Sequence, residues 1–272
     1  VIFTCDDFSS TLKKAKEIIP LENTYENDYL YTSFVKPVAY SMDGYYFLKF
    51  NLAYAAIHPL TQEEFLTKYP FLVVFHEKGE LIEFRFDVLK RVFLSDKKEP
   101  TIYSNLIAEM SDYFKEHFEC DLIPLNLDFM VNVCKRDENV KLIAQSMKLP
   151  NGGNAQLDVG NNQEYILPFI GELRSLLNDN QAELEKVPDF REALEQFMFE
   201  MEEMSDYPWI ELLWENEIKT RSNRVKFVFN YMNKSYCLIQ YYYSNVLIGM
   251  ERMNYVIEYI VNHRNDDTTQ NE

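Results

Sequence analysis

Hydrophobic residues recur along this chain with two periods, one typical of amphipathic helices and one typical of half-buried strands. Apolar residues that return every three or four positions predict helices over 8–19, 104–120 and 245–263. The longest stripe of this kind lies in 190–204, whose other face is acidic. The residues of this stripe that we expect to face a core are Phe190, Ala193, Leu194, Phe197, Met198, Met201 and Met204.

Alternation of apolar and polar residues, together with turn signals, predicts antiparallel hairpins. Asp43-Gly44 separates two runs rich in aromatic and β-branched residues, and 71–76 and 81–88 flank a turn at 77–80. A further hairpin is predicted from 224–232 and 236–243. In the strand 81–88, one face is apolar, and the other should be an exposed ladder of alternating charges. The residues of that ladder are Glu83, Arg85 and Asp87.

Other segments have weaker patterns. The capping-box spacing of Thr61-Gln62-Glu63-Glu64 predicts a short helix to Lys68 that Pro70 ends. Alternation over 125–133 predicts a strand, and 137–149 is expected to be a helix. A short helical segment is expected near 205–213, where Pro208 suits a first turn. The Gly- and Asn-rich stretch 150–163 should be a long loop or a small hairpin.

These elements together predict an α+β fold, in which antiparallel hairpins form a sheet packed with amphipathic helices. The chain has 272 residues, a net charge of -17 and a pI near 4.7. Residues 1–98 hold fourteen acidic and twelve basic residues, whereas 99–272 hold thirty and fifteen. This change predicts a near-neutral part at 1–98, an acidic part at 99–264 and a flexible tail at 265–272. A single continuous domain is the alternative.

The sequence also indicates in which compartment the protein resides and whether it binds a metal or cofactor. There is no apolar run near 18 residues, and residues 1–20 lack the hydrophobic core of a signal peptide, so we expect a cytoplasmic protein without a membrane partner. The four cysteines are too scattered for a disulfide framework, which favours a reducing compartment. The four histidines lie far apart, with no spacing typical of metal ligands, so we expect no metal and no cofactor.

The stretch 181–217 carries much of the negative charge, with twelve acidic residues and only two basic ones. We expect it to bind a basic protein through charge and through aromatic and Met anchors. The residues expected to do so are Glu192, Glu195, Glu200, Glu202, Glu203 and Trp209. The alternative is a solvated helix face that the basic run at 219–226 partly neutralises.

No catalytic motif stands out, so the preferred function is that of a non-enzymatic interaction or regulatory protein. An inhibitor, an immunity-type or defence protein and a subunit of a complex all fit this description, with homo-oligomerisation and a microbial or phage origin as further hypotheses. A metal-dependent nuclease or phosphodiesterase centred on Glu83, Arg85 and Asp87 is one alternative. Nucleic-acid binding is another, opposed by the overall charge. The residues that would carry it are Lys219, Arg221, Arg224 and Lys226.

Overall fold

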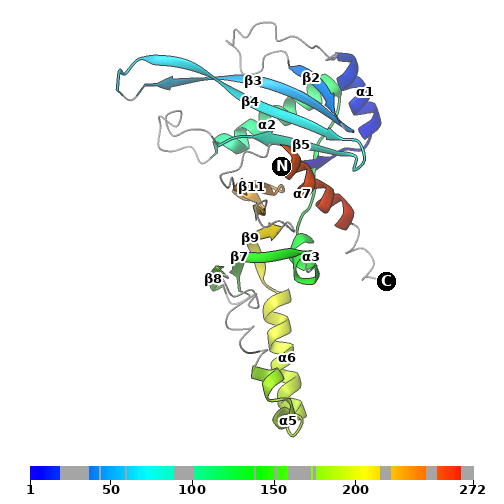
Figure 1. The fold of residues 1–272 in the computed structure, drawn as a ribbon, viewed down its shortest axis with the longest axis vertical. Helices are drawn as coiled ribbons and strands as arrows, with labels where there is room; N and C mark the ends of the chain where they lie inside the picture. Colours follow the sequence, from blue (N-terminus) through cyan, green and yellow to red (C-terminus); the bar gives the residue numbers. More distant parts are fainter. Residues whose placement is uncertain are drawn as a thin grey trace. The chain divides into compact units, whose positions relative to one another are not determined.

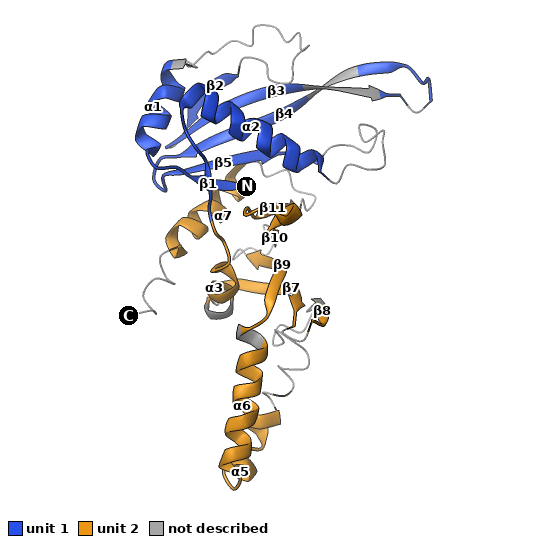
Figure 2. Ribbon diagram, turned by 180° about the vertical axis from the view of Figure 1, so that it is seen from behind, with its two compact units in different colours: residues 1–125 blue, residues 126–272 orange. Residues whose placement is uncertain are grey.

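The chain forms two compact units, Val1–Leu125 and Asn126–Glu272 (Figure 2). The computed structural model describes residues 1–18, 37–42, 44–58, 60–88, 101–137, 139–149, 152–158, 173, 176–214, 222–242 and 250–264. Each unit combines an antiparallel sheet with helices, so the predicted α+β class is confirmed. The division follows Leu125, whereas the boundary that the charge pattern predicts near Lys98 lies outside the described residues. The predicted tail at 265–272 also lies outside them.

Unit 1 is built on a sheet with the strand order β2-β3-β4-β5-β1-β6. The strands are β1 Ile2–Thr4, β2 Val38–Met42, β3 Tyr45–Ile57, β4 Glu64–His76, β5 Leu81–Phe86 and β6 Ile123–Pro124. Helices α1 (Phe8–Ile18) and α2 (Ile102–Phe118) lie on the same face of this sheet (Figures 1 and 2). Their aromatic side chains pack on β4, since the ring centroid of Phe75 is 6.1 Å from that of Phe8 and 6.0 Å from that of Phe114.

The predicted hairpins of unit 1 are confirmed. β2 pairs with β3 around a turn in which Gly44 has a φ of 83°, a conformation that favours glycine. β4 pairs with β5, and Ile82 and Phe84 are buried as expected. Helices over 8–19 and 104–120 are confirmed as α1 and α2.

The prediction of a helix over 61–68 is wrong, because strand β4 begins at Glu64 and includes the rest of this segment. β4 pairs with β3 from Glu64 to His76, and this long ladder satisfies more backbone groups than one short capped helix would. The Thr61 hydroxyl does accept a hydrogen bond from a backbone N–H, that of Glu63 at 3.4 Å, but within the turn. Pro70 continues the strand; it precedes Phe71, where the pairing with β5 begins.

Unit 2 has a second sheet, with the order β11-β10-β9-β7-β8. Its strands are β7 Val140–Lys148, β8 Asn154–Asp158, β9 Asp206–Trp214, β10 Asn223–Val228 and β11 Leu238–Tyr242. Its helices are α3 Met130–Arg136, α5 Gln181–Leu184, α6 Pro188–Glu203 and α7 Met250–His263, with a short 3-10 turn η2 at Tyr231–Asn233. The predicted C-terminal hairpin and helix are therefore confirmed as β10, β11 and α7.

Three other predictions for unit 2 are wrong. Part of the strand predicted over 125–133 is helix α3, the helix predicted over 137–149 is strand β7, and the helical segment near 205–213 is strand β9. β7 and β9 pair with each other in the middle of the sheet, which gives both a ladder on each side. Pro208 is accommodated because the β7–β9 register shifts beside it, between Ser146 and Lys148. The Gly-rich stretch contains the turn of the β7–β8 hairpin.

Candidate functional site

Helix α6 exposes large apolar side chains beside its carboxylates. Phe190, Phe197, Phe199 and Met204 are 61%, 48%, 57% and 65% exposed. The stripe predicted to face a core is therefore only partly buried, which corrects the prediction. Met198 is buried against Met147 of β7 and Leu177, with Leu194 and Met201 partly buried beside it. We use the name α6 surface for Phe190, Glu192, Glu195, Phe197, Phe199 and Glu200.

The exposed phenyl rings occupy two sides of α6. Phe197 lies about two turns after Phe190 on one side, and Glu200 follows Phe197 by three positions. Phe199 lies about two and a half turns after Phe190, on the opposite side. Glu192 and Glu195 precede Phe199 by seven and four positions, so this ring stands among carboxylates. Both sides thus combine an apolar anchor with negative charge.

Two of these carboxylates have partners within the helix. Arg191 Nε donates to Glu195 Oε1 at 2.7 Å, and Gln196 Nε2 donates to Glu200 Oε1 at 2.9 Å. The last turn of α6 contains no basic residue, although the negative end of the helix dipole favours cations there. The sequence places Glu200, Glu202 and Glu203 in that turn. The side chains of Glu202 and Glu203 lie outside those that the structure describes.

The basic run meets the acidic segment on the sheet, at β9. Arg224 of β10 pairs with the buried Glu211 of β9, and Lys226 Nζ lies 3.6 Å from the ring centroid of Trp209. Trp209, a predicted partner-binding residue, is therefore half-buried under a cation. Lys219 and Arg221 lie outside the described residues. The pairing seen here involves Glu211 and leaves Glu192, Glu195 and Glu200 of α6 exposed.

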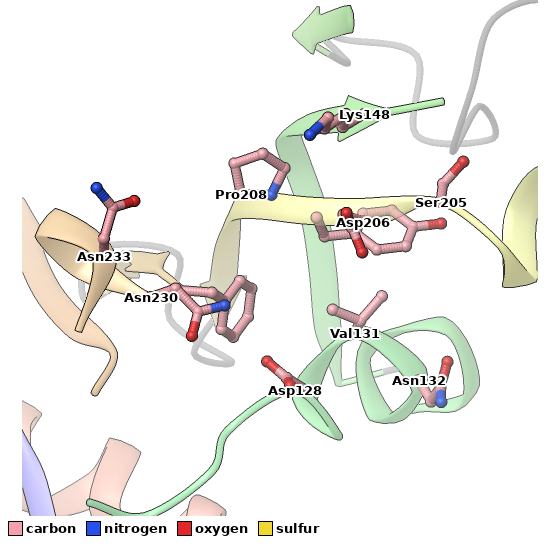
Figure 3. A pocket seen from close by; sticks show the side chains of 11 residues that line it. Asp128, Val131, Asn132, Lys148, Ser205, Asp206, Pro208, Asn230 and Asn233 are labelled. Carbon is pink, nitrogen blue, oxygen red and sulfur yellow. The ribbon is translucent and has the colours of Figure 1, made fainter. Parts of the chain in front are cut away.

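A cavity of about 620 Å³ opens in unit 2 where the chain leaves α6 (Figure 3). Ser205, Asp206 and Pro208 of the α6–β9 segment form one wall, and Asp128 precedes α3 on another. Its lining has two carboxylates and one ammonium group, that of Lys148. Asn side chains and the aromatic rings of Tyr207 and Phe229 complete it. Such a lining can accept hydrogen bonds from a cationic or hydroxyl-bearing group.

Two of the predicted catalytic residues, Glu83 and Arg85, are buried in unit 1. They are 2% and 4% exposed, so the expected exposed ladder of charges is wrong. Glu83 Oε2 lies 2.6 Å from Arg85 Nη2 and 2.8 Å from Nε2 of His76. Burial would raise the pKa of Glu83, but Arg85 and His76 together lower it to about 2. Asp87 is exposed, and its backbone carbonyl accepts a hydrogen bond from the Tyr69 hydroxyl.

The hydrolase and nucleic-acid alternatives stay predictions. Among the described side chains, no three or more His, Cys, Asp or Glu residues are grouped so that they could hold a metal ion. The described part of the chain also has no helix that is long and apolar enough to cross a membrane.

Sequence reasoning did not identify His76 or the residues of the cavity. His76 pairs with Leu81 across the β4–β5 turn, two positions from Glu83 on the same face, so the hairpin register could have placed it there. The cavity combines side chains from α3, β7, β9 and the β10–β11 turn, and no local pattern connects these segments.

Comparison with known proteins returned no relative. The sequence matches no protein-family profile, no curated protein and no solved structure at a significant level.

Proposed function

We propose that this protein is a non-enzymatic interaction protein whose α6 surface binds a basic, amphipathic segment of another protein. The observation that carries the proposal is the exposure of Phe190, Phe197 and Phe199 on a helix that also displays carboxylates. Interfaces are enriched in aromatic anchors, and exposed apolar groups rimmed by polar residues are typical of binding surfaces.

Charge defines the class of partner. Glu192, Glu195 and Glu200 are exposed, and the sequence adds Glu202 and Glu203 in the same helix. Carboxylates at the C-terminal end of a helix oppose its dipole, so they do not favour the helix itself. A partner rich in Lys and Arg would relieve their mutual repulsion and would be steered toward them. Apolar side chains of the partner would cover the phenyl rings.

The cavity extends the same acidic region. Its wall begins at Ser205, two residues after α6 ends, and its carboxylates Asp128 and Asp206 are both exposed. A Lys or Arg side chain of the partner would find acceptor oxygens there. We therefore include the cavity in the proposed interface as the place where one cationic side chain of the partner binds.

The proposal can be tested with two synthetic peptides of equal positive charge. One forms an amphipathic helix of Lys and Leu, and the other has Gln in place of Leu. Fluorescence anisotropy with the full chain should show tighter binding of the Lys/Leu peptide, weakening as salt rises. The triple variant Glu192→Lys, Glu195→Lys, Glu200→Lys should bind roughly tenfold or more weakly. Phe199→Ala should also weaken binding, because it removes an anchor while keeping every charge.

Helix α2 provides a matched control. Glu109, Asp112 and Glu116 are exposed carboxylates of α2, so the variant Glu109→Lys, Asp112→Lys, Glu116→Lys changes the net charge by the same amount. This variant should retain most of the affinity. Equal weakening by both triple variants would show that only net charge matters and would overturn the proposal. Equal affinity for the Leu and Gln peptides would overturn the role of the phenyl rings.

A further inference from the structure

Two thiols that lie far apart in the sequence meet in unit 1. Cys5 directly follows β1, and Cys120 follows the end of α2, three residues before β6. β6 pairs with β1 so that Thr4 lies opposite Ile123, which brings the two cysteines to the same end of this strand pair. Each thiol there shifts the pKa of the other. Thr11 of α1 adjoins the pair, with Oγ1 3.9 Å from Cys5 Sγ. Both are free thiols; Cys5 is half-buried and Cys120 is buried.

We propose that Cys5 and Cys120 form a reversible disulfide when the protein meets a hydroperoxide, with Cys5 as the attacking thiol and Cys120 as the resolving thiol. This site is independent of the α6 surface, because all of its residues belong to unit 1. Pairs of this kind, an accessible thiol beside a resolving one, are typical of redox-sensitive cysteines in reducing compartments.

The environments of the two sulfurs assign their roles. The hydrogen bond from Cys120 lowers the pKa of the Cys5 thiol to about 7, and it outweighs burial and the nearby Asp6 and Asp7. A substantial fraction of Cys5 is therefore thiolate at neutral pH, and the thiolate is the nucleophile. The same hydrogen bond, followed by burial, raises the pKa of Cys120, so Cys120 stays a thiol. The partly exposed sulfur is thus the reactive one.

The chemistry balances with a peroxide as the oxidant. The Cys5 thiolate attacks one peroxide oxygen, the O–O bond breaks, and the leaving hydroxide takes a proton to become water. The sulfur of Cys120 then attacks the resulting sulfenic acid of Cys5, forming the S–S bond. The sulfenic oxygen leaves as water with the Cys120 proton. Two electrons pass from the thiols to the peroxide, and a dithiol reductant reverses the change.

The disulfide would join the β1–α1 connection to the end of α2. Asp7, two residues after Cys5, caps α1 by accepting a hydrogen bond from the Ser10 N–H at 2.8 Å. Cys120 directly follows Glu119, which ends α2 in a left-handed conformation with a φ of 52°. Oxidation would therefore fix the ends of both helices that cover the sheet of unit 1.

Mass spectrometry of the full chain tests the proposal. After brief treatment with hydrogen peroxide and alkylation of the remaining thiols, digestion should give a peptide pair linked through Cys5 and Cys120. The pair should disappear on reduction. In Cys120→Ser, Cys5 should stop at the sulfenic acid, which dimedone traps. In the untreated protein, alkylation of Cys5 should be roughly tenfold faster than that of Cys134 or Cys237, because both of these are buried.

Cys134→Ser serves as the control and should leave the linked peptide unchanged. The wild-type experiment decides the question even if a serine variant does not fold. Absence of the linked peptide, or oxidation of Cys5 directly to the sulfinic acid without a link to Cys120, would overturn the proposal. Disulfides only between different molecules would also overturn it.

Discussion

The carboxylate of Glu83 is held ionised inside unit 1 by Arg85 of the same strand, β5, and by His76 of the adjacent strand, β4. Arg85 and His76 contact the same oxygen, and together they outweigh the effect of burial on the pKa. The pKa in the folded state is about 2, below the ordinary value of 4.5. Folding is therefore favoured by ionised Glu83 above about pH 4.5, and this contribution is lost as the pH falls toward 2.

Glu83→Gln should lower the free energy of unfolding at neutral pH by on the order of 3 kcal/mol, because it removes the carboxylate that forms a buried ion pair with Arg85. The variant should also lose part of the pH dependence of stability between about pH 4.5 and 2. Urea denaturation at several pH values measures both effects. Glu80→Gln, at an exposed position in the turn that precedes β5, is the control. An unchanged pH profile in Glu83→Gln would contradict this account.

At the scale of single residues, the sequence predicted which side chains share a face but not how deeply they are buried. The alternation in β5 correctly separated Phe84 from Glu83 and Arg85. The polar face was expected to be exposed because charges are usually solvated. Whether a charged side chain is buried depends on its tertiary contacts and on the presence of oppositely charged or hydrogen-bonding partners. The alternation of residues along a single strand gives no information on either.

At the scale of elements, α6 has a row of buried and partly buried side chains along one side. The carboxylates in its last turn are unfavourable there, because they lie at the negative end of the helix dipole. Glu200→Lys should therefore stabilise the protein by about 0.3–1 kcal/mol at low ionic strength. The same substitution should weaken binding of the Lys/Leu peptide, because it removes a carboxylate from the α6 surface. Chemical denaturation and anisotropy measure the two effects. Lower stability together with unchanged affinity would contradict the assignment of Glu200 to binding.

Helices and hairpins with strong local signals were predicted correctly, and segments with ambiguous patterns were not. α2 has a long apolar stripe, and the β4–β5 hairpin has a clear turn signal between its strands. The segments that form β7 and β9 were predicted as helical, yet they pair with each other as strands, from Lys148 with Asp206 to Val140 with Trp214. Such long-range pairing overrides weak local preferences. The extent of burial of the α6 stripe was also mispredicted, because an apolar stripe does not show how much of it will contact a core.

At the scale of the whole molecule, both compact units are acidic. Unit 1 has twenty acidic and thirteen basic residues, and unit 2 has twenty-four and fourteen. The excess of negative charge is thus shared between the two units. What distinguishes unit 2 is the concentration of that charge near exposed phenyl rings on α6.

Hydrogen exchange of the full chain, with and without the Lys/Leu peptide, tests the central claim most directly. The peptide should slow exchange of backbone amides in Pro188–Glu203 and in the adjoining segment at Ser205 and Asp206. The amides of α2, which also carries exposed carboxylates, should exchange as before. Protection confined to α2 or to other acidic surfaces, with α6 unchanged, would contradict the account.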